Sequence, residues 1–170
     1  PSHAAYVPFG HTGIGSGGQL AADFVLGELK PLLEDPAVKK VGHNLKYDRN
    51  VLLNHGIRMD GILHDTMLES YINNSVAVRH NLGSVAKKYI NLDTLNYEDV
   101  VGKGVKQIPF AEVPLEDAAF YAAEDADACL RLHKELYPRI KGAIGLERVY
   151  SDIEIPLISV LSEMERTGVL

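Results

Sequence analysis

The stretch Tyr121-Ala122-Ala123-Glu124-Asp125-Ala126-Asp127 lies inside the longest helical pattern of this sequence, which runs from Pro114 to Tyr137. At roughly 100° per residue, apolar side chains return to one side of this helix. That side is predicted to be buried and consists of Leu115, Ala122, Ala126 and Cys129. The register of this helix therefore decides which of its acidic side chains reach solvent.

The three acidic residues of the stretch point in different directions. Glu124 lies about 180° from the apolar side, and Asp127 lies about 120° away, with Arg131 placed four residues later for a surface ion pair. Asp125 lies only about 80° away, one turn after Tyr121, and no basic residue follows it at the fourth position. A carboxylate at the edge of a core is unfavourable without a counter-ion. A bound cation would compensate, so Asp125 is a candidate functional residue.

A second acid, Asp48, sits in the first turn of a predicted helix that directly follows a predicted strand. Ligands gather at such strand ends in α/β sheets. An acid in a first turn also interacts favourably with the helix dipole, and this structural role is an equal alternative. The residues around Asp48 do not decide between the two.

Strand and helix patterns alternate along the chain, which predicts an α/β fold with a mixed, partly parallel sheet flanked by helices. Strands are expected at residues 4–9, 38–42 and 57–64. Helices are expected at residues 19–33, 46–54, 66–73, 81–89, 114–137 and 153–167, and Asp65 or Thr66 is expected to cap the third of them. A glycine-rich loop is expected at 10–18 and a linker at 138–145. The first helix is expected to have an apolar side made of Leu20, Phe24, Leu29, Leu32 and Leu33. Three short strands are few for such a sheet, so further strands are expected upstream.

Composition excludes some classes of protein and leaves others open. The net charge of −6 is unlike that of a protein that coats nucleic acid, but it is compatible with a metal-dependent nuclease. One cysteine, Cys129, excludes an internal disulfide and fits a reducing compartment. No CxxC, HExxH or Cys/His cluster is present, so no structural zinc site is predicted. No bilayer-spanning run or secretion signal is visible, and the first residue is Pro1, which suggests a piece of a longer protein.

Two motifs together resemble the proofreading 3′→5′ exonucleases of the DEDD superfamily. Asn44-Leu45-Lys46-Tyr47-Asp48 is similar to the second motif of that superfamily, and Tyr121-Ala122-Ala123-Glu124-Asp125 to the third, in its Tyr-x-x-x-Asp form. Further segments resemble the polymerase I family in particular: residues 65–71, Arg79-His80, Gly102-Lys103-Gly104, residues 153–157 and residues 165–169. The resemblance implies an exonuclease-like domain over residues 1–143, followed at 144–170 by a linker and the first helix of a polymerase domain.

The resemblance implies a ribonuclease H-like fold in which four carboxylates hold two divalent cations, Mg²⁺ or else Mn²⁺ or Zn²⁺. Asp48 and Asp125 would be two of these catalytic metal ligands, and the Tyr121 hydroxyl would orient the attacking water. Substrate-binding residues would be Asn44, Tyr47, Arg79 and Tyr97, the last of which would stack on a base. The implied partners are a single-stranded DNA 3′ end and an adjoining polymerase domain. The implied setting is replication and repair in a bacterial cytoplasm, near the nucleoid.

One motif of the family has no counterpart in this sequence. Its first motif, Asp-x-Glu on the opening strand, should lie upstream of Ala4, and Asp23, the only acid before Glu28, belongs to a predicted helix. The implied site is therefore incomplete, with the N-terminal strands missing. Residues 1–170 alone are expected to have little or no exonuclease activity.

Three alternatives compete with this interpretation. Gly13-Ile14-Gly15-Ser16-Gly17-Gly18 matches the G-x-G-x-x-G pattern of dinucleotide-binding folds, although Pro8 interrupts the preceding strand. A ribonuclease D-like exoribonuclease would share the fold and the acids. A non-catalytic DNA-holding or spacer domain would share the fold without binding metal.

Overall fold

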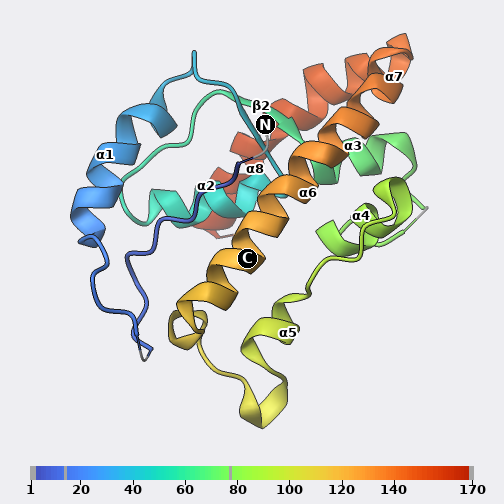
Figure 1. The fold of residues 1–170 in the computed structure, drawn as a ribbon. Helices are drawn as coiled ribbons and strands as arrows, with labels where there is room; N and C mark the ends of the chain where they lie inside the picture. Colours follow the sequence, from blue (N-terminus) through green and yellow to red (C-terminus); the bar gives the residue numbers. More distant parts are fainter. Residues whose placement is uncertain (1–2, 14, 77, 169–170) are drawn as a thin grey trace.

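The computed structural model describes residues 3–13, 15–76 and 78–168, so that Ile14 of the glycine-rich loop and Val169 of the last motif lie outside the described residues. Figure 1 shows helices packed around a small sheet. In chain order the elements are α1 (Ala22–Glu34), β1 (Lys40–Gly42), α2 (Leu45–Leu53), β2 (Ile62–Asp65), α3 (Thr66–Asn73), α4 (Leu82–Ile90), α5 (Tyr97–Val101), the 3₁₀ turns η1 (Gly104–Lys106) and η2 (Phe110–Glu112), α6 (Leu115–Lys141), α7 (Ile144–Val149), the π-helical turn η3 (Tyr150–Glu154) and α8 (Ile155–Thr167). Within this part of the chain, no helix is long and apolar enough to cross a membrane.

The sheet consists of two strands in the described residues. β1 and β2 run parallel, with Val41 opposite His64 and Gly42 opposite Asp65. Each strand leads almost directly into a helix, so the first turns of α2 and α3 lie at the same edge of the sheet. The predicted α/β alternation with parallel pairing is confirmed.

The predicted strand at residues 4–9 is wrong, because this segment has no strand partner and is irregular. A side-chain contact holds it instead: Tyr6 packs on the buried cluster of Val101, Val113 and Ala118. The Tyr6 hydroxyl also lies 2.6 Å from His11 Nε2. The glycine-rich loop that follows therefore lacks the preceding strand that a dinucleotide-binding fold requires.

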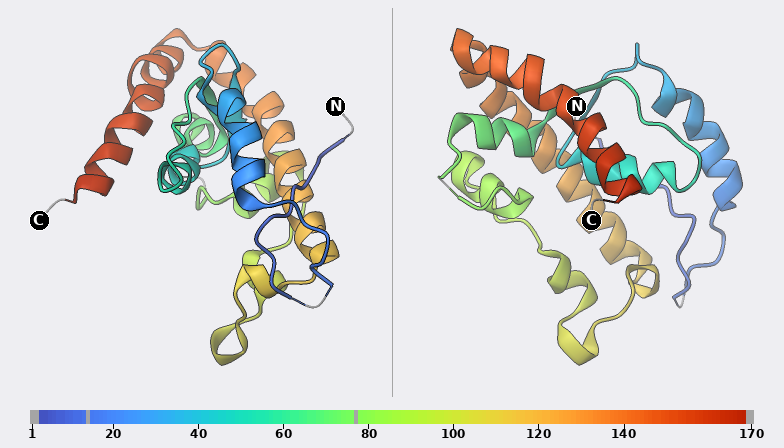
Figure 2. Two further views of the ribbon diagram at one scale, coloured as in Figure 1. Left: turned by 90° about the vertical axis from the view of Figure 1, so that its left-hand side faces the viewer. Right: turned by 180° about the vertical axis from the view of Figure 1, so that it is seen from behind.

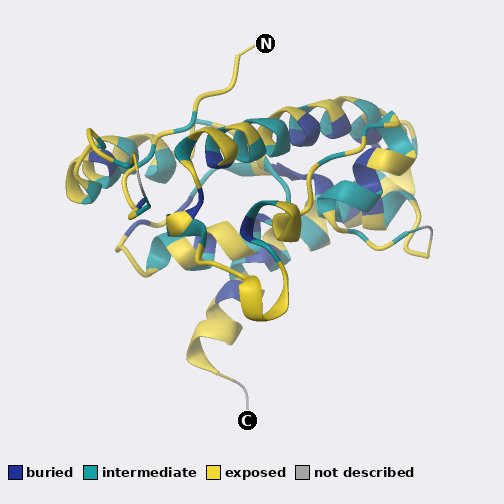
Figure 3. Ribbon diagram, turned by 60° about the horizontal axis from the view of Figure 1, so that its bottom comes forward, coloured by how far each residue is buried: buried dark blue, intermediate teal, exposed yellow. Residues whose placement is uncertain are grey.

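Helix α6 is the longest element and runs along the whole body (Figure 1). In Figure 3 the ribbon of this helix carries both buried (dark blue) and exposed (yellow) residues. The buried side chains are Ala118, Ala128, Cys129, Leu132, Leu136 and Ile140. The predicted burial of Ala126 is wrong: it is exposed, because it faces a cleft rather than the core. The predicted linker at 138–145 is also wrong at its start, since buried Leu136 and Ile140 hold the helix in place on both sides of Pro138.

Helix α1 lies at the periphery, where the predicted apolar side is largely uncovered. Phe24 and Leu32 are exposed, as is Leu20 just before the helix, whereas Val25 is the buried residue. The helix is held at its C-terminal end, where the Leu33 carbonyl accepts a hydrogen bond from the backbone of Asp60. The pattern therefore identified the helix but not the face that packs.

Helix α8 packs against α2, as the right-hand view in Figure 2 shows. Polar contacts hold the pair: buried Ser162 donates to Asn50 Oδ1 at 2.5 Å, and Lys46 forms an ion pair with Glu165. The predicted helix at residues 153–167 is confirmed and begins two residues later than expected.

The side chain of Asp65 joins the starts of two helices. Its carboxylate is buried. Oδ1 accepts hydrogen bonds from the backbone N–H groups of Met67 (2.9 Å) and Asn44 (3.1 Å). Oδ2 accepts one from the backbone N–H group of Leu45 (2.8 Å). The expected cap of the helix at residues 66–73 is thus confirmed. The same carboxylate also fixes the backbone that enters α2, where Asn44 has left-handed angles (φ 60°, ψ 46°).

We predict that Asp65→Ala lowers the free energy of unfolding by about 3–5 kcal/mol, because it leaves several buried N–H groups unpaired. Asp65→Asn should cost less, since one oxygen remains to accept. Urea unfolding followed by circular dichroism measures both. A loss below about 1 kcal/mol for Asp65→Ala would contradict this role.

Candidate active site

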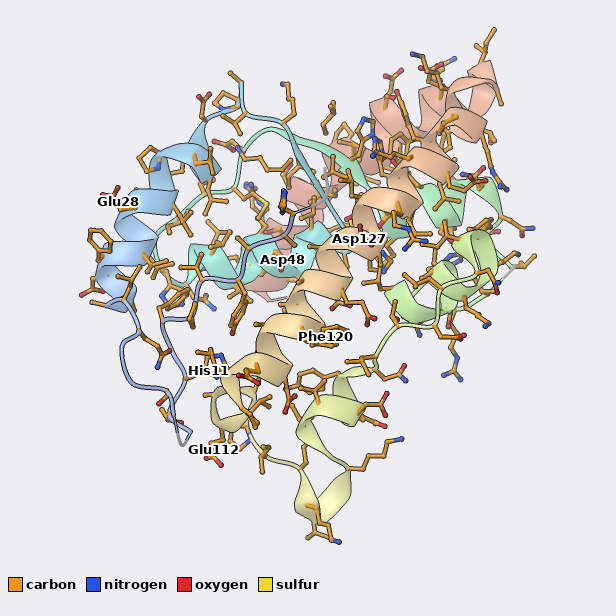
Figure 4. The ribbon with its side chains drawn as sticks, viewed as in Figure 1. His11, Glu28, Asp48, Glu112, Phe120 and Asp127 are labelled. Atoms are coloured by element: carbon orange, nitrogen blue, oxygen red, sulfur yellow. The ribbon has the colours of Figure 1, made fainter. Side chains whose placement is uncertain are left out.

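A cleft of about 490 Å³ lies between β1, the first turns of α2 and α4, and the middle of α6. It brings together Asp48 and Asp125, which the sequence placed on separate helices. In Figure 4, Asp48 lies where α2 passes the middle of α6. The lining residues are Val41, Gly42, His43, Asp48, Leu82, Asp125, Ala126, Cys129 and Leu130.

Asp48 lines this cleft but remains exposed to solvent. Partial loss of hydration raises its pKa, and the nearby charge of Asp65 raises it further. A backbone N–H in the first turn of α2 partly opposes this rise. The carboxylate at this position is thus less favourable than in water.

Asp125 is half-buried, and burial likewise raises its pKa, although the Tyr121 hydroxyl acts in the opposite direction. Burial and the neighbouring Asp125 raise the pKa of Tyr121 to about 12, so the phenol stays protonated at neutral pH. Across the described residues, no salt bridge reaches Asp48 or Asp125. The two acids share a cleft with no cationic side chain paired to either.

A second cleft of about 570 Å³ adjoins the first, and Asp125 lines both. Arg79, Tyr97, Tyr121 and Lys103 also line it. The Tyr97 ring is 44% exposed and stacks on Phe110, with centroids 6.1 Å apart and planes 18° apart. Arg79 and Tyr97, predicted only from motifs, therefore line the same cleft as Asp125.

Asn44 and Tyr47 are placed differently from the other predicted site residues. They belong to the α2 start that carries Asp48, but neither is among the residues that line the two clefts. Tyr47 is 66% exposed. Their predicted contact with a nucleotide thus depends on a substrate reaching across α2.

Two further acids lie in the stretch 121–127, Glu124 and Asp127. The predicted orientation is confirmed for Asp127 and wrong for Glu124. Asp127 pairs with Arg131 at 3.4 Å, as predicted. Glu124 was predicted to point outward but is half-buried and accepts a 2.7 Å hydrogen bond from the Leu95 backbone. It holds the loop before α5 against α6, which the helical pattern alone does not indicate.

Sequence reasoning missed His43, Lys103 and a buried group made of His64, Glu69 and His133. His43 Nδ1 lies 2.9 Å from Thr66 Oγ1, while its Nε2 is buried without a hydrogen-bond partner. His43 directly precedes the motif Asn44–Asp48, and this position could have identified it as a site residue. No pattern in the sequence indicates the buried group, because His133 lies far along the chain from His64 and Glu69.

Comparisons with known proteins identify a family for this chain. A family model described as "3'-5' exonuclease" matches residues 12–141. A DNA polymerase I of Pseudomonas aeruginosa is 50% identical over 169 residues, covering 98% of this chain and 18% of that protein. A DNA polymerase I of Rhizobium leguminosarum is 41% identical, covering 98% and 17%. The chain thus spans less than a fifth of the length of these relatives.

A solved structure supports the fold. It is described as the "POL domain of Pol1 from M. smegmatis complex with DNA primer-template and dNTP". The TM-score is 0.63 at 22% identity, with 88% of this chain and 23% of that chain covered. At this identity the likeness shows a shared fold and nothing about activity.

We predict that Asp125→Asn stabilises the chain at pH 7 in the presence of a chelator. Since its folded pKa is raised, the unfolded state releases this proton first, and stability falls as pH rises past the ordinary value of 3.8. Urea midpoints at pH 7 and at about pH 3 should therefore show a gain for the variant only at pH 7. Asp127→Asn, from the same helix, is the control. A lower midpoint for Asp125→Asn at pH 7 would contradict the prediction.

Proposed function

This chain belongs to the 3′-5′ exonuclease family, and from that premise we propose that its cleft removes nucleotides from the 3′ end of single-stranded or frayed DNA. The activity would be the proofreading step of a DNA polymerase I that acts in replication and repair. The observation that carries the proposal is the meeting of Asp48 and Asp125 in one cleft, without cationic partners. The whole polymerase, its polymerase domain and a place near the nucleoid are parts of the same proposal.

The donor set of the cleft suits a hard divalent cation. Both acids offer carboxylate oxygens, which Mg²⁺ and Mn²⁺ prefer. Both are less favourable as free anions than in water, because burial and lost hydration raise the pKa of each. Two such cations, when bound, supply an activated water and stabilise the displaced oxygen. The residues present thus fit the group, although the two carboxylates of the family's first motif are not among residues 1–170.

Neighbouring side chains supply the other parts of the proposed reaction. Tyr121 remains a protonated donor at neutral pH and can orient a water beside Asp125. Tyr97, backed by Phe110, presents a ring on which a terminal base can stack. Arg79 and Lys103 place positive charge in the second cleft, where phosphates of the strand would lie.

We also propose the ribonuclease H-like form of this fold, with further strands and the Asp-x-Glu motif supplied from outside residues 1–170. The two-stranded sheet supports this, because Val41 on β1 is exposed next to the cleft acids. In this arrangement residues 1–143 belong to the exonuclease domain. Residues 144–170 begin the connection to the polymerase domain.

We expect Asp125→Asn, in protein expressed from the whole reading frame, to slow Mg²⁺-dependent release of 3′-terminal nucleotides by about 10²- to 10³-fold. Asp127→Asn is the matched control, since Asp127 lies on the same helix but pairs with Arg131. Quench-flow with a labelled single-stranded oligonucleotide measures both rates. Equal rates for the two variants would sink the proposal. Preference for an RNA strand would favour the ribonuclease D-like alternative.

Residues 1–170 alone are expected to digest the same oligonucleotide at below about 1% of that rate, because half of the carboxylate set is absent. The measurement is made at matched concentrations with Mg²⁺ or Mn²⁺. Mg²⁺-dependent digestion by residues 1–170 that Asp125→Ala abolishes would show that the acids present suffice.

A further inference from the structure

A second group of metal-binding side chains lies inside the body, outside both clefts. It contains His64 from β2, Glu69 from α3 and His133 from α6, and the Tyr150 hydroxyl at the start of η3 reaches it. One donor atom of each of the first three residues lies within 4.8 Å of the others. Four separate elements thus direct polar atoms at one point.

The carboxyl group of Glu69 is the centre of this group. Its Oε1 lies 2.7 Å from His133 Nδ1, 3.5 Å from His64 Nδ1 and 3.3 Å from the Tyr150 hydroxyl. Its Oε2 is buried and has no hydrogen-bond partner. A buried polar atom without a partner is unfavourable, and a bound ligand would satisfy it.

We propose that His64, Glu69 and His133 form a structural site for a transition-metal ion, with Zn²⁺ the best match. Two imidazole nitrogens and one carboxylate are zinc ligands, and the Tyr150 hydroxyl or a water would take the fourth position. Tetrahedral zinc needs donor atoms roughly 3.3 Å apart, so small side-chain rotations suffice. Hard cations such as Mg²⁺ prefer oxygen, which separates this site from the cleft acids.

A plain hydrogen-bond network explains the same contacts less completely. It would satisfy the pair of His133 and Glu69, but it leaves Oε2 unpaired and gives His64 Nδ1 only contacts of 3.4 to 3.5 Å. A metal bound by both carboxylate oxygens of Glu69 would satisfy Oε2 and also give His64 Nδ1 a partner.

A metal at this site would stabilise the packing of η3, the segment that leads into α8. Tyr150 is buried, donates to Glu69 and accepts a 3.1 Å hydrogen bond from the backbone of Asp65. A metal at Glu69 would thus hold β2, α3, α6 and η3 together. The His133 side chain is 18% exposed, so this edge of the group lies nearest to solvent.

We expect the double variant Asp48→Asn/Asp125→Asn, which removes the cleft acids, still to bind one equivalent of Zn²⁺ in calorimetry. Adding Glu69→Gln should weaken this binding by roughly 100-fold. Glutamine keeps the size of the buried Glu69 side chain and removes only the carboxylate ligand. Glu135→Gln is the control, an acid on α6 that pairs with Arg139.

X-ray absorption at the zinc edge of the double variant provides a test without substitutions at the site. Two imidazoles in a four-coordinate shell are expected. No zinc binding by the double variant, an oxygen-only shell, or equal affinity after Glu69→Gln would each overturn the proposal.

Discussion

The structure depends on the buried carboxylate of Asp65. Its oxygens accept backbone N–H groups at the starts of α2 and α3, and its own N–H donates to Tyr150. Two parallel strands that end at the same edge would otherwise leave those N–H groups unpaired in the interior. One side chain therefore sets the direction of the turn that carries Asp48 and links it to the segment before α8.

Helix α6 then combines two kinds of chemistry along one element. In its first half, Asp125 faces a cleft whose donor atoms are carboxylate and hydroxyl oxygens, suited to hard cations and a phosphodiester. In its second half, His133 faces an interior group with two imidazoles, suited to a structural metal. The separation follows from helix geometry, because eight residues place His133 about 12 Å further along the axis than Asp125 and about 80° around it.

Much of this arrangement could be predicted where a local rule was sufficient. Helical periodicity placed Asp125 at the core edge, and cap chemistry placed Asp65 at the start of α3. The predictions were wrong where contacts between distant segments determine the structure. Helix α1 buries Val25 instead of Phe24, and Pro138 remains helical between two buried residues. The Glu124 carboxylate accepts a hydrogen bond from a loop backbone instead of pointing outward. The group at Glu69 required a contact between distant segments, which no local pattern contains.

The proposed function depends on Asp48 and Asp125 belonging to one metal-binding site in the cleft. Mn²⁺ titration of the ¹³C-labelled chain, followed by paramagnetic broadening of the aspartate carboxyl signals, tests it most directly. The account predicts that Asp48 and Asp125 broaden together, at Mn²⁺ concentrations that leave Asp127 sharp. Broadening of the two at different concentrations, or no earlier than Asp127, would contradict it.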